Sequence, residues 1–311
     1  MNTILKPQVQ LEVTELRTLE GDYQTLVINL HLEAGERLKP NALGSLELPS
    51  ELDLSREVIL FGKAPIWLYS YLVHCCHSAP WVGCYAMEEQ SAVLVHSRVS
   101  HKAAGDKVCV PFYRPLCPAI LIGGPPDSGK SVLSNALCRS LRRHKPEKNI
   151  FLCRAHWDGQ GNWTYEMPNR DLACKLVKEY ENRLDPQAAE LLQRYFDNRA
   201  EAVKNIRAVA DLVLVDVGGR VQAEKAPVVS QCTHYIIISR DIDAIAQWHD
   251  FCRPTLKPLA VIHSVQEQRE EPLQKQPVLE MIAGRWEEEE TSSVPNELLQ
   301  EVLRHWTVPE N

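Results

Sequence analysis

The first third of the chain alternates between apolar and polar positions, with short apolar runs in between. Alternation with a period of two is typical of strands that bury one face. The predicted strands are residues 9–14, 24–32, 57–61, 81–85 and 92–95. A single helix is predicted from about Pro65 to Cys76, with Pro65 in its first turn. We therefore predict a small, β-rich α+β domain over residues 1–112.

Beyond residue 113 the pattern changes to nearly continuous apolar runs, separated by stretches of helical periodicity. The predicted buried strands are residues 118–122, 149–155, 211–217, 235–239 and 259–263. The predicted helices are residues 132–143, 170–183, 186–207, 242–252 and 296–306. Strands that alternate with helices indicate a parallel sheet, so residues 118–311 are predicted to form an α/β domain. Two prolines within 113–118 mark the boundary, and residues 267–290 are predicted to be charged and irregular.

Length, charge and cysteine usage narrow the classes of partner and compartment. A chain of 311 residues suits two domains, and a net charge of −7 argues against a protein that binds long nucleic acid. The ten cysteines form no C-x-x-C pair, so most of them are predicted to be small core residues, and a reducing cytoplasm is the simplest compartment. No apolar run is long enough to span a bilayer or to form a signal peptide, so no membrane partner is expected.

The stretch from Gly124 to Ser131 has the chemistry of a phosphate-binding loop. It fits G-x-x-x-x-G-K-[ST] at every fixed position and lies between a predicted strand and a predicted helix. A glycine-rich turn points its N–H groups at an anion, and the start of the following helix adds its own. The predicted nucleotide-binding residues are Gly124, Pro125, Pro126, Asp127, Ser128, Gly129, Lys130 and Ser131. We expect Lys130 to reach the β- and γ-phosphates of ATP and the Ser131 hydroxyl to bind Mg²⁺.

Two aspartates follow predicted strands of the same domain. Asp216 closes the apolar strand 211–217, where a carboxylate can hold Mg²⁺ opposite Ser131. Asp158 follows the strand 149–155, so it is expected at the carboxyl edge of the sheet, beside the phosphates. There it would orient an acceptor hydroxyl or a water molecule; the alternative is a plain Asp-Gly turn. Both aspartates are candidate catalytic residues, and Ser131 and Asp216 are the candidate metal ligands.

The N-terminal domain contains a second junction of strand, glycine and helix. The candidate ligand-binding residues there are Gly62, Lys63, Ala64, Pro65 and Trp67. A phosphodiester could rest on the helix N-terminus with the charge of Lys63 beside it; the alternative is a plain turn. His74 and His77 are three residues apart near the end of the same helix, so they can share a face. A pair of histidines lacks a third metal ligand, so exposed or capping histidines are favoured.

Several of these residues carry a resemblance to a known family. Residues 61–68, His77, residues 80–82, Tyr85 and residues 92–95 closely resemble the small CRISPR-associated ring nucleases of the Csx type. The resemblance implies a ferredoxin-like fold and self-association into a dimer or higher oligomer. It also implies binding of cyclic oligoadenylate, above all cyclic tetra-adenylate, which is the second messenger of type III CRISPR systems. The family cuts this messenger with Mn²⁺.

The resemblance extends to the second domain and also shows a departure. Some members carry a C-terminal P-loop NTPase or AAA-like domain, which residues 157–163, 247–252 and 257–264 resemble. His77 matches a histidine implicated in cleavage, so it is a candidate catalytic residue. The family then has Asp-Pro-Arg after a tyrosine, where this chain has residues 86–88, Ala-Met-Glu.

Three functions follow from these observations. The first is a ring nuclease whose second domain hydrolyses ATP or transfers its phosphate. The second is a small-molecule or nucleotide kinase that uses the first domain for assembly. The third is a sensor that binds the messenger without cutting it, which the missing Asp and Arg favour.

Overall fold

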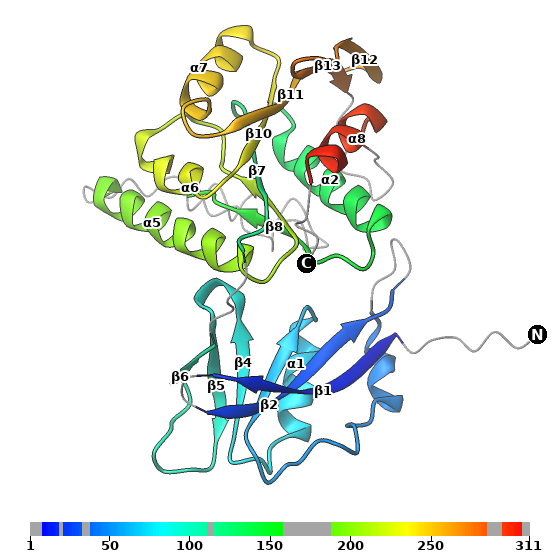
Figure 1. The fold of residues 1–311 in the computed structure, drawn as a ribbon, viewed down its shortest axis with the longest axis vertical. Coiled ribbons are helices and arrows are strands. Elements are labelled where there is room, and N and C mark those ends of the chain that lie inside the picture. The colour runs from blue at the N-terminus through cyan, green and yellow to red at the C-terminus, as the bar shows by residue number, and fades with distance from the viewer. Residues whose placement is uncertain are drawn as a thin grey trace, which may run out of the picture. The chain divides into compact units, whose positions relative to one another are not determined.

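The computed structural model describes residues 8–18, 21–32, 38–110, 115–157, 188–284 and 294–306. The chain divides into two compact units, Met1–Tyr113 and Arg114–Asn311, and each unit has its own sheet (Figure 1). Within the described residues, none of the helices combines the length and the apolar composition needed to cross a bilayer.

The first unit contains a six-stranded sheet in which the strands lie side by side in the order of the sequence. The strands are β1 (Val9–Arg17), β2 (Asp22–Leu30), β3 (Val58–Gly62), β4 (Trp81–Ala86), β5 (Ser91–Ser97) and β6 (Lys107–Cys109). The pairs β2–β3 and β3–β4 are parallel, and the other neighbouring pairs are antiparallel. Helix α1 (Ile66–Cys75) connects β3 to β4, and a 3-10 turn covers Pro40–Ser45. Leu26, Leu60 and Leu72 are fully buried between the sheet and α1.

This sheet corrects the ferredoxin-like fold that the family resemblance implied. A ferredoxin-like domain has the order β-α-β-β-α-β, with a helix after its first strand. Here β1 and β2 form an antiparallel hairpin whose turn is closed by a hydrogen bond from the Thr18 hydroxyl to the Gly21 carbonyl, 2.8 Å long. A turn this short leaves no room for the helix that a ferredoxin-like domain has after its first strand. The short strand β6 was also not predicted.

The second unit is built on a seven-stranded sheet with the order β12-β13-β11-β10-β7-β9-β8. Its strands are β7 (Ala119–Gly123), β8 (Ile150–Arg154), β9 (Leu212–Asp216), β10 (His234–Ser239), β11 (Lys257–Ser264), β12 (Arg269–Gln274) and β13 (Leu279–Gly284). Its helices are α2 (Lys130–His144), α5 (Ala188–Arg207), α6 (Ala226–Ser230), α7 (Ile242–Cys252) and α8 (Asn296–His305). All neighbouring strands are parallel except β12 and β13. The predicted α/β sheet is therefore confirmed.

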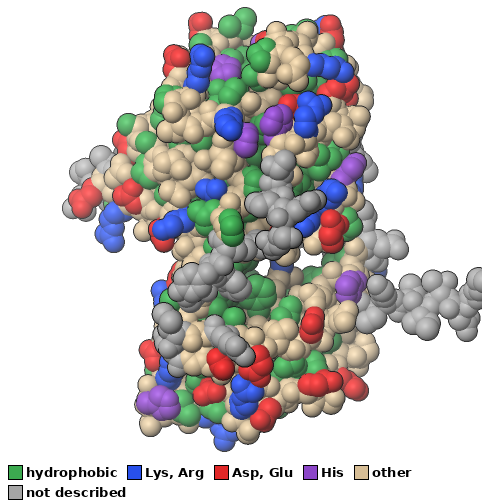
Figure 2. Space-filling model, in the orientation of Figure 1, with side chains coloured by type: hydrophobic (Ala, Val, Ile, Leu, Met, Phe, Trp, Pro, Cys, Tyr) green, Lys and Arg blue, Asp and Glu red, His purple; other side chains and the backbone are tan. Residues whose placement is uncertain are grey.

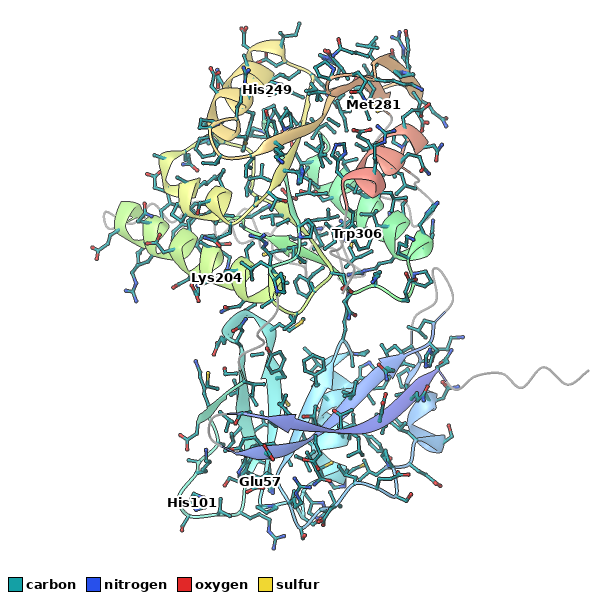
Figure 3. The ribbon with its side chains drawn as sticks, in the orientation of Figure 1. Glu57, His101, Lys204, His249, Met281 and Trp306 are labelled. Carbon is teal, nitrogen blue, oxygen red and sulfur yellow. The ribbon has the colours of Figure 1, made fainter. Side chains whose placement is uncertain are left out.

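Helices cover both faces of this sheet. Figure 1 shows α2 and α8 on one side, and α5, α6 and α7 on the other. Leu137 of α2 and Leu298 of α8 are fully buried in one core with the apolar strands. Beyond α8, the indole of Trp306 donates a hydrogen bond to the Asp211 carbonyl at 3.0 Å (Figure 3). Helix α8 ends at His305, one residue before the predicted end at residue 306.

The segment 267–290 was predicted to be irregular, and its described part, residues 267–284, contradicts this prediction. Residues 269–274 and 279–284 form β12 and β13, which pair antiparallel at the edge of the sheet. Every residue of β12 is exposed, so the segment has no buried face of the kind from which a strand is predicted. In β13 the residues alternate, and Leu279, Met281 and Ala283 are buried. Figure 3 labels Met281. The predicted helix 170–183 lies outside the described residues.

Charged side chains are distributed over both units. Figure 2 shows acidic and basic groups interspersed on the face in view, so the net charge of −7 is not gathered there into one acidic patch. The sheet order of the second unit has a consequence for its chemistry. Strand β7 lies between β9 and β10, and β8 lies beside β9, so the carboxyl ends of these parallel strands meet at one edge.

Candidate functional site

The phosphate-binding loop, residues 124–131, connects β7 to α2 as predicted. Gly124 has a φ of 153°, and a Cβ built on it would lie 2.0 Å from the carbonyl oxygen of Ile238 in β10. Gly129 has a φ of 93° immediately before the first residue of α2. Both positions require glycine, because a side chain would be strained at either one and would collide with β10 at the first. The loop is thus pressed closely against the neighbouring strand.

Lys130 and Ser128 place polar groups within this loop. The Lys130 ammonium donates a hydrogen bond to the Pro125 carbonyl at 2.7 Å, so its side chain curls back over its own loop. The Ser128 hydroxyl is buried and has no hydrogen-bond partner among the described residues. A buried hydroxyl without a partner is costly, and an additional polar group bound in the loop would satisfy it. The loop therefore fits a phosphate.

Ser131 and Asp216 meet, although 85 positions separate them in the sequence. Asp216 is the last residue of β9, and its carboxylate accepts a hydrogen bond from the Ser131 hydroxyl at 2.8 Å. Because β9 pairs directly with β7, the carboxylate reaches the base of the loop that follows β7. A hydroxyl and a carboxylate are oxygen ligands of the kind that Mg²⁺ prefers. The structure brings the two predicted ligands together, and their metal role stays a prediction.

Basic side chains surround the Asp216 carboxylate, which is fully buried. His156 Nε2 lies 2.8 Å from one carboxylate oxygen, and Arg154 Nη1 lies 3.7 Å from the other. Burial raises the pKa of Asp216, but the His156 hydrogen bond and the charges of His156, Lys130 and Arg154 lower it overall to about 2. Asp216 is therefore ionised at neutral pH and available to a cation.

Arg154 and His156 were missed by the sequence analysis. Both lie at the carboxyl end of β8, which pairs with β9, so they come to the same edge as Asp216. The rule that chemistry gathers at the carboxyl ends of parallel strands would have singled them out. It was applied only to Asp158, which follows them and lies outside the described residues. The carbonyl of His156 accepts a hydrogen bond from the Tyr195 hydroxyl of α5 at 2.7 Å.

The turn after β9 contacts the phosphate-binding loop. Gly218 has a φ of 74°, and a Cβ on Gly219 would lie 2.6 Å from the backbone nitrogen of Pro126. The Arg220 side chain, which follows this pair of glycines, is exposed. The backbone of this turn, rather than that arginine side chain, is the part that touches the loop.

A second buried lysine holds this turn. The Lys225 ammonium donates to the Arg220 carbonyl at 2.5 Å and lies 5.8 Å and 5.9 Å from the ring centres of Phe196 and Trp248. It would lie 3.6 Å from a Cβ on Gly218. Cations are attracted to the faces of aromatic rings, so the two rings help to hold the ammonium. No local sequence pattern indicated Lys225, because its neighbours come from α5 and α7.

The junction predicted in the first unit is present between β3 and α1. Gly62 has a φ of 140°, and a Cβ on it would lie 2.5 Å from the Ile28 carbonyl oxygen. The Tyr69 hydroxyl donates to the Gly62 carbonyl at 2.6 Å. Pro65 is the residue before α1 rather than within its first turn, Lys63 is exposed, and Ala64 and Trp67 pack partly against the core. Binding at this junction stays a prediction.

His77 lies at the other end of α1. Its Nδ1 is 2.7 Å from the His74 carbonyl oxygen, and the two histidine rings are stacked with their centres 5.6 Å apart. His96, which the sequence analysis did not single out, places Nε2 2.9 Å from the His77 carbonyl oxygen. Within the described residues, no group of three or more His, Cys, Asp or Glu side chains is placed to hold a metal ion. The role of His77 with Mn²⁺ stays a prediction.

Of the residues that replace the family's Asp-Pro-Arg, Ala86 ends β4, and the next two begin a 3-10 turn, Met87–Glu89, that leads to β5. Glu89 forms an ion pair with Lys107 at 2.5 Å. Its carboxylate is thus occupied within the sheet. Helix α1 has ten residues, so its two ends are about 15 Å apart. Gly62 and His77 accordingly lie far from each other within one chain.

Comparisons with known proteins match the first unit to a CRISPR-associated family. The family Cas_csx3, a CRISPR-associated protein, matches residues 31–109. An uncharacterized protein of Aquifex aeolicus (strain VF5) is 28% identical over 111 residues, which are 35% of this chain and 96% of that protein. The resemblance of this part of the chain to a CRISPR-associated family is thus confirmed. The ring-nuclease type stays a prediction.

Several solved structures of P-loop proteins are distantly similar to this chain. The kinase domain of the Escherichia coli tyrosine kinase ETK is 16% identical, with a TM-score of 0.33 over 47% of this chain and 67% of that one. The MinC:MinD cell division protein complex of Aquifex aeolicus is 16% identical, with a TM-score of 0.30 over 47% and 69%. Thymidylate kinase from Ehrlichia chaffeensis is 13% identical, with a TM-score of 0.32 over 61% and 98%. The assignment of a P-loop fold rests instead on the loop, the strand order and the contact between Ser131 and Asp216. The AAA-like subtype stays a prediction.

Proposed function

We propose that the second unit binds ATP with Mg²⁺ and either hydrolyses it or transfers its γ-phosphate. The observation that carries this proposal is the 2.8 Å contact between Ser131 and the buried, ionised Asp216, at the base of a complete phosphate-binding loop. Both side chains are suited to hold one Mg²⁺ ion, which would neutralise charge on the β- and γ-phosphates when bound.

The residues of the loop then have separate tasks. The N–H groups of the loop bind the phosphates, and Lys130 exchanges its bond to the Pro125 carbonyl for one to a phosphate oxygen. The turn at Gly218 and Gly219 brings backbone close to the γ-phosphate. Asp158 orients the group that attacks, which is water in an ATPase and an acceptor hydroxyl in a kinase.

The test is ATP consumption by the full chain, measured with and without candidate nucleoside and small-molecule acceptors. Lys130→Ala should abolish it, because the loop loses its phosphate-binding cation. Lys204, which is exposed on α5 (Figure 3), provides the matched control: Lys204→Ala removes an equal charge and should leave turnover unchanged. Consumption that requires an acceptor identifies a kinase, and consumption in water alone identifies an ATPase. Equal turnover by the wild type and Lys130→Ala would refute the proposal.

For the first unit we propose binding of a cyclic oligoadenylate, with cyclic tetra-adenylate as the first ligand to try. The match of residues 31–109 to a CRISPR-associated family supports this proposal. So does the junction at Gly62, which offers a helix N-terminus with the exposed Lys63 beside it. A phosphodiester of the ring would rest there.

Cleavage of the messenger by His77 with Mn²⁺ is the finer proposal. Because α1 separates His77 from Gly62 by about 15 Å, a ring bound at the junction of one chain would be cut by the His77 of another copy. Self-association into a dimer or higher oligomer, which the family resemblance implies, would supply that copy. The lost Asp and Arg favour the alternative of a sensor that binds without cutting.

One experiment separates the two outcomes. Labelled cyclic tetra-adenylate is incubated with the purified protein and Mn²⁺, with and without ATP, and the products are resolved. Linear fragments that disappear with His77→Ala establish cleavage, whereas intact ligand that remains bound establishes a sensor. Lys63→Ala should weaken binding of cyclic tetra-adenylate in both cases. If the wild-type protein does not bind this ligand, the proposal of a binding site at the junction is refuted.

A further inference from the structure

Asp127 occupies an unusual backbone conformation in the phosphate-binding loop. Its φ is 57°, and among the described non-glycine residues only Gln90 also has a positive φ. Aspartate tolerates this left-handed region better than most residues do, but glycine adopts it without the cost. Strained positions of this kind are often retained because the side chain has a function.

The Asp127 carboxylate is exposed at the tip of the loop. Within the described residues it has no hydrogen-bond or ion-pair partner, since Lys130 of the same loop bonds to the Pro125 carbonyl instead. A local turn or cap therefore does not explain the side chain. Once the loop is occupied, the bound ligand and its metal bring charge close to this carboxylate.

The loop cannot move this carboxylate away from a bound phosphate. On one side, Gly124 lies so close to β10 that a Cβ would be 2.0 Å from the Ile238 carbonyl oxygen. On the other side, Gly219 lies so close that a Cβ would be 2.6 Å from the nitrogen of Pro126. Asp127 follows Pro126 directly, so its backbone is held between two neighbouring elements. The charge is thus fixed within one side-chain length of the backbone that binds phosphate.

We propose that Asp127 determines which ionic form of the nucleotide this loop accepts, an inference that rests on the proposed ATP site. Free ATP carries about four negative charges at neutral pH, and its magnesium complex carries about two. A fixed carboxylate repels the first about twice as strongly as the second on a free-energy scale. The residue therefore disfavours free nucleotide and selects the magnesium complex, so that nucleotide affinity depends steeply on Mg²⁺.

Nucleotide binding by the full chain tests this inference without any turnover measurement. Dissociation constants for ATP are measured by calorimetry in EDTA and in excess Mg²⁺, for the wild type, Asp127→Asn and Asp127→Gly. Asparagine removes the charge but keeps a residue that tolerates the left-handed region, whereas glycine also removes the backbone cost. Asp197→Asn removes one negative charge from an exposed position of α5 and is the matched control for net charge.

We expect Asp127→Asn to bind ATP about tenfold more tightly in EDTA and about threefold more tightly in Mg²⁺, because the charge acts on about four and about two ligand charges. The advantage that Mg²⁺ gives should therefore shrink about threefold, while Asp197→Asn behaves as the wild type.

Three results would overturn the inference. The first is an Asp127→Asn variant whose dissociation constants for ATP equal those of the wild type. The second is an Asp127→Asn variant that binds ATP more tightly by the same factor in EDTA and in Mg²⁺. The third is tightening by Asp127→Gly alone, which would assign the effect to the backbone. Lys130→Ala should lose ATP binding in both buffers, whether or not Asp127 selects the magnesium complex. If neither the wild type nor Asp127→Asn binds ATP in Mg²⁺, the proposed nucleotide site is refuted and this inference with it.

Discussion

The contact between the turn after β9 and the phosphate-binding loop predicts a large effect from a single methyl group. In Gly219→Ala the new Cβ would meet the nitrogen of Pro126 at 2.6 Å and two of its ring atoms at 2.8 Å. None of these atoms can rotate aside, because they belong to the backbone or to a closed ring. Ordinary contacts of a Cβ begin at 3.4 Å, so the turn and the loop must separate by up to 0.8 Å.

A displacement of that size affects the chemistry more than the fold. Misplacing catalytic groups by about 1 Å can cost about 100-fold in rate, so kcat for ATP should fall about 10- to 100-fold. This loss corresponds to about 1.4 to 2.7 kcal/mol of transition-state stabilisation. ADP affinity should change little, because its phosphates contact the loop itself and not the turn.

Gly218→Ala is the matched control. Its φ of 74° strains an alanine by about 1 kcal/mol, but the nearest atom to the new Cβ is 3.6 Å away, so nothing collides. We expect lower stability with kcat within a few-fold of the wild type, which is the reverse of Gly219→Ala. Steady-state ATP turnover, ADP titration and thermal unfolding of both variants give the comparison. Wild-type turnover in Gly219→Ala would refute the reasoning.

Three further predictions concern other parts of the chain. Asp216→Asn should lose Mg²⁺-dependent turnover and about 3 kcal/mol of unfolding free energy, because it leaves His156 and Arg154 beside a neutral group; denaturant unfolding measures the second effect. Gly62→Ala should lower the unfolding free energy of the first unit by at least about 2 kcal/mol, since its Cβ would lie 2.5 Å from the Ile28 carbonyl oxygen. A circular dichroism melt with the wild-type midpoint would contradict this. If the two ligand sites are coupled, ATP should change the affinity for cyclic tetra-adenylate by the same factor by which cyclic tetra-adenylate changes the affinity for ATP. Paired titrations that give unequal factors would exclude equilibrium coupling.

Much of the second unit was predictable because its central strands are buried on both faces. Strands β7, β9 and β10 are continuous apolar runs, which no other local structure explains as well. The segment β12 was not predictable, because all six of its residues are exposed and it is held by pairing with β13. In such a strand the backbone hydrogen bonds, rather than the side chains, decide the structure.

The first unit shows a second limit of sequence patterns. Residues 24–32 were predicted to alternate, yet Gln24 and Thr25 are both buried beside Leu26. Gln24 can be buried because its amide donates to the Asp53 carbonyl and accepts from the Asp53 N–H, both at 2.8 Å. That compensation comes from a distant loop, which periodicity cannot reveal.

The candidate site also contains residues that the sequence predicted and residues that it did not. Ser131 and Asp216 were predictable, because a linear motif and a strand end identify them without knowledge of the fold. Arg154 and His156 depend on β8 lying next to β9, and a sequence of alternating elements does not give that order. Lys225 depends on aromatic rings from two further helices. Side chains that surround a site are specified by topology, whereas those that define the motif are specified locally.

Lys225 connects the turn after β9 to helices α5 and α7. Its ammonium lies against Phe196 of α5 and Trp248 of α7, and the Trp248 ring lies under Gly123, where the phosphate-binding loop begins. If this turn moves when the γ-phosphate leaves, the Lys225 ammonium moves with it. Its contacts with the rings of Phe196 and Trp248 then change together. Helices α5 and α7 lie on the same side of the sheet (Figure 1). A displacement of this one turn would therefore reach two helices on one side of the sheet through a single side chain.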